Sequence, residues 1–216
     1  MSIHQVATLD DTSRIQFVDS ATGSGTATSF SLTVPVTAQA GDLAIYNLAT
    51  DTTTAYTYPA DWTFLQSAFN SSAKGATIAK ILSASDVGAT VTITGDGGSD
   101  PWAGIMLIFR GFQNFKFFTA KSLNIESTSG NPTAQTVTSS VDNGKSVLVI
   151  GSTSGRPTGG NGSFSTENPT FDAIIASASL RVGYKIYNKG DTVVNHTVDM
   201  NDINQNILQS FYMIFQ

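Results

Sequence analysis

The sequence predicts an all-β protein: an antiparallel β-sandwich, jelly-roll-like, built from two related halves. Three observations lead to this fold class: short runs that alternate apolar and polar residues, Gly-, Asn- and Asp-rich turns between them, and matching segments in the two halves. With 216 residues, the chain can bury roughly 70% of the surface that it would expose when unfolded. This length suits one large all-β domain or two small ones.

Alternation and β-branched runs predict strands along the whole chain. The first set of expected strands is 15–18, 28–34, 43–48, 62–69, 76–82, 90–94 and 104–109. The second set is 134–139, 146–152, 171–177, 180–187, 192–198 and 209–215. Turn residues such as Gly41-Asp42 and Gly190-Asp191 separate neighbouring strands. Helical signals are confined to one short turn at 83–88 and another at 201–206.

Four segments of the first half have counterparts in the second half. Residues 41–46 match 144–150, 79–81 match 184–186, 88–91 match 190–193, and 106–109 match 212–215. The matches keep their order and an offset of roughly 105 residues, as expected for an internal duplication. The alternative is that strands of any β-protein resemble one another.

The matches suggest how the chain is divided. We expect an N-terminal arm and first strand at 1–27 and a compact sandwich body at 28–216, with its halves at about 28–111 and 132–216. No Pro- or Ser-rich linker stands between the halves, which favours one compact body. Whether the halves form one sandwich or two in tandem stays open at this point.

The composition argues against several classes of partner. The net charge is −5 and no cluster of Lys or Arg is present, so no nucleic-acid partner is expected. No apolar run reaches the about 18 residues that span a bilayer, so no membrane partner is expected. The first ten residues lack the basic and apolar blocks of a signal peptide. Cysteine is absent, which removes disulfides and thiolate chemistry.

No catalytic, cofactor-binding or metal-binding residues are predicted, and we do not expect an enzyme. Asn143-Gly144-Lys145-Ser146 ends like a phosphate-binding loop, but the first Gly of that pattern is missing and a strand follows where a helix is needed. His4 and His196 have no cooperating group that the sequence identifies. Asp96 and Asp100 form the best candidate cation loop, although a plain hairpin connection is the favoured interpretation.

Phenylalanine is concentrated between the halves, where five of the ten residues from Phe109 to Phe118 are Phe. One interpretation is a strand that bridges two sheets and fills their core. The other is a subunit interface, where aromatic residues concentrate. The interface interpretation selects Phe112, Phe115, Phe117 and Phe118, together with Ile3 and Val6 of the polar N-terminal arm.

Four segments in order carry a family resemblance: residues 38–45 with Gly41-Asp42, 58–65 with Trp62, 79–86 with Lys80, and 103–111 with Arg110-Gly111. This order resembles small β-sandwich virion structural proteins of tailed bacteriophages, which are found among capsid-surface or tail-fibre components. The resemblance covers about half of the chain, mostly residues 28–111. It departs at Asp61, where the family pattern has Gly before the Trp, so the turn is expected to differ there.

The resemblance implies a non-enzymatic role on a virus particle, assembled in the bacterial host cytoplasm and frequently as a homotrimer. The expected function is that of a capsid decoration or cement protein, whose partners are the major capsid protein or other virion subunits. The alternative is a tail-fibre or spike module that binds host-surface glycan. In that case exposed aromatic residues would stack on sugar rings, and Tyr56, Tyr58 and Trp102 are the candidates.

Overall fold

A computed structural model of the chain describes residues 14–51, 53, 55–69, 74–111, 119–120, 135–137, 146–154, 164–188, 191–192, 196–200 and 207–215. These residues form antiparallel β-sheets, which confirms the predicted all-β class. Within them the one helical element is a 3-10 turn, η1 (Ala84–Asp86), where the sequence predicts a short turn. No helix of the described residues is long and apolar enough to cross a membrane.

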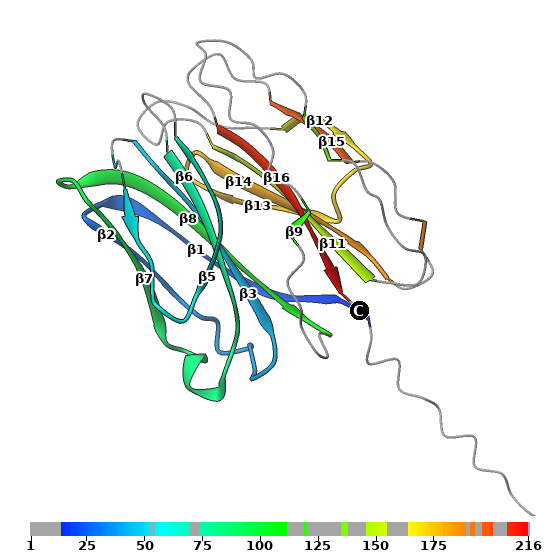
Figure 1. Ribbon diagram of the computed structural model, residues 1–216, viewed down its shortest axis with the longest axis horizontal. Helices are drawn as coiled ribbons and strands as arrows, with labels where there is room; N and C mark the ends of the chain where they lie inside the picture. The colour runs from blue at the N-terminus through cyan, green and yellow to red at the C-terminus, as the bar shows by residue number, and fades with distance from the viewer. Residues whose placement is uncertain are drawn as a thin grey trace, which may run out of the picture.

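The first part of the chain forms two sheets. The N-terminal large sheet has the order β1 (Gln16–Ala27), β8 (Asp100–Arg110), β3 (Leu43–Thr50), β6 (Lys74–Ile81) and β5 (Thr63–Phe69). The N-terminal small sheet has the order β2 (Ser29–Thr33), β7 (Thr90–Gly95) and β4 (Tyr56–Thr57). The small sheet lies on the outer face of the large one (Figure 1).

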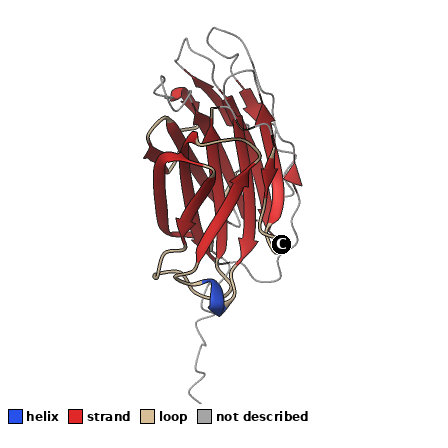
Figure 2. Cartoon of the chain, turned by 90° about the vertical axis from the view of Figure 1, so that its left-hand side faces the viewer, coloured by secondary structure: helices blue, strands red, loops and turns tan. Residues whose placement is uncertain are grey.

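The second part also forms two sheets. The C-terminal large sheet has the order β13 (Ala173–Ser177), β14 (Leu180–Tyr187), β11 (Ser146–Ser154), β16 (Ile207–Phe215) and β9 (Thr119–Ala120). The C-terminal small sheet has the order β10 (Gln135–Val137), β15 (His196–Met200) and β12 (Phe164–Asn168). The two large sheets face each other and the small sheets lie outside them, so the strands form a stack of layers (Figures 1 and 2).

Strands β3 and β8 lie inside the N-terminal large sheet and are buried on both faces. Alternate side chains of a strand point to opposite faces. Ile45 of β3 and Leu107 of β8 therefore join a cluster that also contains Ile150 and Val182 of the C-terminal large sheet. Tyr46, Met106 and their even-numbered neighbours join a second cluster beneath the N-terminal small sheet. This double burial explains why both strands read as nearly continuous apolar runs.

Aromatic rings join the two large sheets. The rings of Phe17 and Tyr184 stack with centroids 5.0 Å apart, and Phe109 meets both rings edge-on, at 5.8 and 5.2 Å. Two hydrogen bonds support the same interface: the Ile15 N–H donates to Asn188 Oδ1 at 3.0 Å, and Ser177 Oγ donates to Gly23 O at 2.8 Å. The start of the described chain is thus fixed to its last third.

Strand β1 is longer than the sequence predicts. The expected strand covers residues 15–18, whereas β1 extends to Ala27 and pairs with β8 along its whole length, with a bulge between Phe17 and Asp19. Residues 19–27 are small and polar, so no alternation marks them. The short strands β4, β9 and β12 are also unexpected, and the turn expected at 201–206 lies outside the described residues.

A pair of glycines forms a flat floor for one aromatic ring. Gly151 of β11 and Gly183 of β14 lie opposite each other, and the buried Phe171 ring covers both. A Cβ at Gly183 would lie 2.2 Å from Cδ2 of Phe171, and one at Gly151 would lie 2.6 Å from Cζ. Glycine is therefore needed here because the ring approaches the backbone closely.

We expect Gly183→Ala to lower the free energy of unfolding by about 1–3 kcal/mol, because the new methyl group displaces the Phe171 ring. Urea denaturation followed by fluorescence measures the loss. Gly97→Ala is the control, since no heavy atom lies within 4 Å of a Cβ built there. Equal midpoints for the two variants would contradict the role assigned to Gly183.

Candidate functional site

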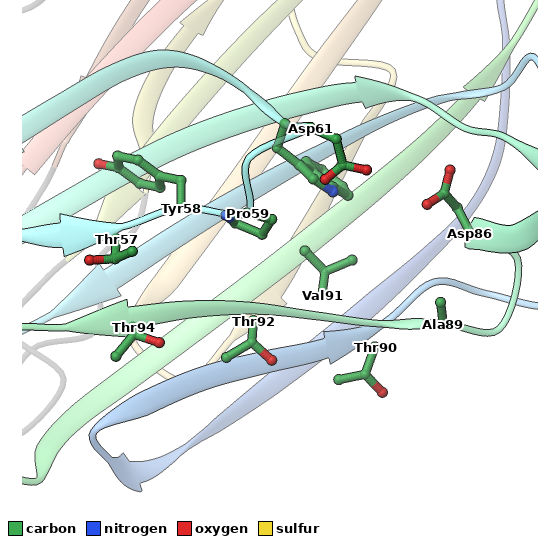
Figure 3. A pocket seen from close by; sticks show the side chains of 11 residues that line it. Thr57, Tyr58, Pro59, Asp61, Asp86, Ala89, Thr90, Val91, Thr92 and Thr94 are labelled. Atoms are coloured by element: carbon green, nitrogen blue, oxygen red, sulfur yellow. The ribbon is translucent and has the colours of Figure 1, made fainter.

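A groove of about 410 Å³ opens between β7 and the segment 58–62 that leads from β4 to β5 (Figure 3). Its walls carry aromatic, hydroxyl and carboxylate side chains. The lining residues are Thr57, Tyr58, Pro59, Asp61, Trp62, Asp86, Ala89, Thr90, Val91, Thr92 and Thr94. A concave site with a few convergent polar groups is the usual form of a small-ligand site.

The groove exists because β4 is very short. It pairs with β7 at Tyr56 and Thr57, and Pro59 lies two residues after Thr57. Proline lacks a backbone N–H and cannot continue a ladder. The Trp62 N–H then donates to Pro59 O at 3.1 Å, which closes a turn, and the chain crosses into the N-terminal large sheet as β5. Strand β7 continues past the point where β4 leaves it.

The edge of β7 that faces the groove is open at two residues. The Gly95 N–H donates to Thr28 O, and Ala89 O accepts from the Val34 N–H, so the odd-numbered residues of β7 bond toward β2. Even-numbered residues bond toward the opposite side, as the bond from Asp96 N–H to Ala55 O shows. From Thr90 to Ile93, no described strand pairs with this side of β7. The backbone groups of Thr90 and Thr92 therefore face the groove.

An ionic cluster stands at one end of the groove. Lys80 Nζ donates to Asp61 Oδ2 and, at 2.7 Å, to Asp86 Oδ1. Asp86 Oδ2 also accepts from the backbone N–H and the hydroxyl of Ser83, both at 2.6 Å. Burial alone would raise the pKa of Asp86, but the hydrogen bonds from Lys80 and Ser83 outweigh it and hold the pKa below its ordinary value. Two carboxylates and one ammonium give the cluster a net negative charge.

Aromatic side chains form the other end and the floor. Tyr58 is half-buried beside Tyr56 and Phe64, with ring centroids 6.1 and 5.3 Å away. Burial raises the pKa of Tyr58 to about 12, so its hydroxyl is protonated at neutral pH and can donate a hydrogen bond. Trp62 is 8% exposed and lies beneath the groove. The site thus offers an apolar end and a polar end.

Of the three aromatic residues expected at a sugar site, Tyr58 alone lines the groove. The Tyr56 hydroxyl shares a 2.7 Å hydrogen bond with Thr50 Oγ1 inside the sheet. Trp102, expected at the surface, is instead 9% exposed, because its ring packs against Phe30 at the centre of the second cluster. Sequence reasoning missed Asp61, Lys80 and Asp86 as a unit, since their clustering depends on how strands pair.

In the Asp96–Asp100 loop, one of the two carboxylates is buried and hydrogen-bonded within the fold. Asp100 is 1% exposed, and its Oδ2 accepts from both the N–H and the hydroxyl of Thr53 at 2.7 Å. Within the described residues, no group of three or more His, Cys, Asp or Glu is placed to hold a metal ion. Asp100 thus fixes the backbone at Thr53.

The expected interface residues cannot be placed in this fold. Ile3, Val6, Phe112, Phe115, Phe117 and Phe118 lie outside the described residues. Phe109, the first residue of the Phe-rich segment, ends in the core between the large sheets. That position agrees with the core interpretation for this one residue.

The residues that carry the family resemblance hold the framework together. Asp42 is 1% exposed, and its carboxylate accepts two hydrogen bonds from Arg110, each 2.8 Å long, plus one from the Gln39 N–H. Gly41 and Gly111 flank this pair with φ of 92° and 106°. Trp62 and Lys80 also have defined partners in the fold. Asp42, Arg110 and Lys80 therefore fix the structure through their ion pairs, and Trp62 does so through the core.

Comparison with protein-family models, with curated proteins and with solved structures finds no match.

We expect Arg110→Met to lower the free energy of unfolding by about 3 kcal/mol, because it leaves the buried Asp42 carboxylate without its cation. Arg181→Met is the matched control, since Arg181 donates to the carbonyl oxygens of Ala178 and Leu180 rather than to a carboxylate. Urea denaturation of both variants gives the comparison. An equal loss in the two would show that the Asp42–Arg110 pair contributes no more than an ordinary surface contact.

The stability conferred by Asp86 depends on pH. Its pKa is lowered in the folded protein, so its contribution is complete above the pKa of the unfolded chain, about 4, and is lost as the pH falls through the folded value. We expect wild type to exceed Asp86→Asn in urea midpoint at neutral pH, and this gap to narrow as the pH falls below about 4. A gap that stays constant over that range would contradict the assignment.

Proposed function

We propose that this chain is a non-enzymatic structural protein of a tailed-bacteriophage particle, acting as a decoration or cement protein on the outer capsid surface. The observation that carries the proposal is the role of the residues behind the family resemblance. Asp42 and Arg110 form a buried ion pair, Trp62 lies in the core, and Lys80 ties β6 to two turns. These residues build one framework, and this supports the proposal that the resemblance reflects a common fold.

We further propose that the fold is a pair of related jelly-roll-like β-sandwiches joined through their large sheets. The strand orders support this. The order β1-β8-β3-β6-β5 corresponds, strand for strand along the chain, to β9-β16-β11-β14-β13. The small sheets β2-β7-β4 and β10-β15-β12 correspond in the same way.

Hydrogen bonds at equivalent places support the duplication as well. The N–H of Ser83 donates to Asp86 Oδ2, and the N–H of Asn188 donates to Asp191 Oδ2. Lys80 pairs with Asp61, and Lys185 pairs with Asp172. When Asp86 is aligned with Asp191, the offset between the two halves is three residues larger than the offset obtained by matching 88–91 with 190–193. Two copies of one unit thus account for both the sheets and the turns.

The proposed mechanism is adhesion repeated by symmetry. Each copy would contact the major capsid protein or other virion subunits, and many weak contacts on one shell add to a strong attachment. The proposed contacts are Phe112, Phe115, Phe117 and Phe118, with Ile3 and Val6 of the N-terminal arm. A homotrimer would supply three such surfaces to one capsid site.

A second candidate function is host-surface glycan binding by a tail-fibre or spike module. The groove beside β7 favours it, because Tyr58 and Trp62 stand next to hydroxyl and carboxylate groups. Immunogold microscopy of the particle distinguishes the two functions. Label over the head supports decoration, and label confined to the tail tip supports glycan recognition.

We expect a variant without residues 1–12 to remain folded, because Ile15 and the strands that follow it supply the core contacts and the hydrogen bonds between the large sheets, yet to lose binding to capsids. Co-sedimentation with capsids stripped of this protein measures binding, and the urea midpoint reports folding. The full chain is the reference. Undiminished capsid binding by the truncated form would remove the N-terminal arm from the proposed contacts.

A further inference from the structure

We infer that the groove between β7 and residues 58–62 binds one pyranose unit of a neutral sugar. The inference rests on the second candidate function, to which it gives a site and a sugar class. Four features of the groove carry it: its size, its apolar end, its hydrogen-bonding edge and its charge.

The size of the groove suits one ring rather than an extended polymer. Its volume is about 410 Å³, near the lower end of the range of about 300–1,000 Å³ for small-molecule sites. The groove is bounded by the turn at 58–62 on one side and by η1 on the other, and both are tied down by hydrogen bonds. A single pyranose ring fits within these bounds.

The apolar end matches the C–H face of a pyranose. Tyr58 and Pro59 line this end and stay half-exposed (Figure 3), and Trp62 lies beneath the groove. The Tyr58 ring is held against Phe64 and Tyr56, so stacking a ligand on it costs little side-chain freedom. An aromatic ring with a hydroxyl at its edge suits a ligand that is apolar on one face and polar on its rim.

The polar side offers both donors and acceptors to sugar hydroxyl groups. The backbone of Thr90 and Thr92 presents N–H and C=O groups along the open edge of β7. Asp61 is 64% exposed and bonds Lys80 through Oδ2, which leaves Oδ1 as an acceptor. Carboxylates accept hydrogen bonds from hydroxyl groups more strongly than neutral acceptors do. The Lys80 contact fixes Asp61 in place before any ligand arrives.

The charge of the groove selects against acidic sugars. Asp61 and Asp86 both lie in its wall, and Lys80 neutralises one of the two charges. The remaining negative charge would repel the carboxylate of a uronic or sialic acid at close range. A neutral hexose or N-acetylhexosamine carries no such penalty.

An added peptide strand is the competing occupant, and the open edge is too short for it. Strand addition derives its affinity from a run of main-chain hydrogen bonds. Among the described residues of β7, only Thr90 and Thr92 direct backbone groups into the groove, because β4 pairs with β7 at Thr94 and Gly95. Two residues supply too few main-chain hydrogen bonds to hold an added strand. They supply enough hydrogen bonds for a single pyranose ring.

The test uses the full chain labelled with ¹⁵N and a panel of methyl glycosides. The panel contains glucose, galactose, mannose and N-acetylglucosamine, with glucuronic acid and sialic acid as the acidic members. We expect at least one neutral sugar, in the millimolar range, to shift the amide signals of Thr90, Thr92 and residues 58–62, and the acidic sugars to shift none of them. This map on the unsubstituted protein does not depend on the folding of any variant.

Substitutions then test individual contacts. We expect Tyr58→Ala to weaken the binding about tenfold, and Tyr58→Phe to retain most of it, because stacking survives without the hydroxyl. Ile174→Ala is the control, since Ile174 is exposed on β13 in the other large sheet. Urea midpoints of all variants separate a loss of contact from a loss of fold.

Several outcomes would overturn the inference. These are the absence of shifts with every neutral sugar, shifts confined to residues away from the groove, equal binding of acidic sugars, or shifts at β7 produced by an extended peptide instead. The proposed functions are tested separately: capsid binding is measured on capsids, and glycan binding that maps elsewhere would keep the second function while removing this site.

Discussion

The inner strands β3 and β8 of the N-terminal large sheet are buried on both faces, and the rest of the molecule depends on this constraint. One face packs on the C-terminal large sheet and the other on the N-terminal small sheet, through two separate hydrophobic clusters. A strand without a solvent face must be apolar at nearly every position, which β3 and β8 are. Buried charge in this region is tolerated where it is paired, as Asp42 is with Arg110.

The need to cover the apolar face of the N-terminal large sheet also explains the groove. The N-terminal small sheet must cover a wide apolar face with three strands, and β4 contributes two residues to it before the chain returns to the large sheet. The uncovered edge of β7 is what remains. Trp62 closes the core beneath that edge, so one side of its ring serves the fold while Tyr58 and Asp61 stand above it.

Much of the strand content could be predicted from the sequence, because apolar runs and alternation mark buried strands directly. The expected strands at 43–48, 90–94 and 180–187 match β3, β7 and β14 closely. Strand β1 beyond Val18 escaped prediction, since an edge strand of Ser, Thr and Gly carries no hydrophobic signal. The groove could not be predicted from the sequence either, because strand pairing is what brings Asp61, Lys80 and Asp86 together. Trp102 is buried although the sequence predicts that it is exposed, because the burial of an aromatic ring depends on which layer covers it.

The double burial of β3 divides its sequence between two tasks by position. Leu43, Ile45 and Ala49 belong to the interface between the large sheets, while Ala44, Tyr46 and Leu48 belong to the core under the small sheet. In evolutionary terms, each residue of this strand is selected by one neighbour and not by the other. The junction of the two large sheets and the core that supports the groove can therefore diverge independently, even though they share a single strand.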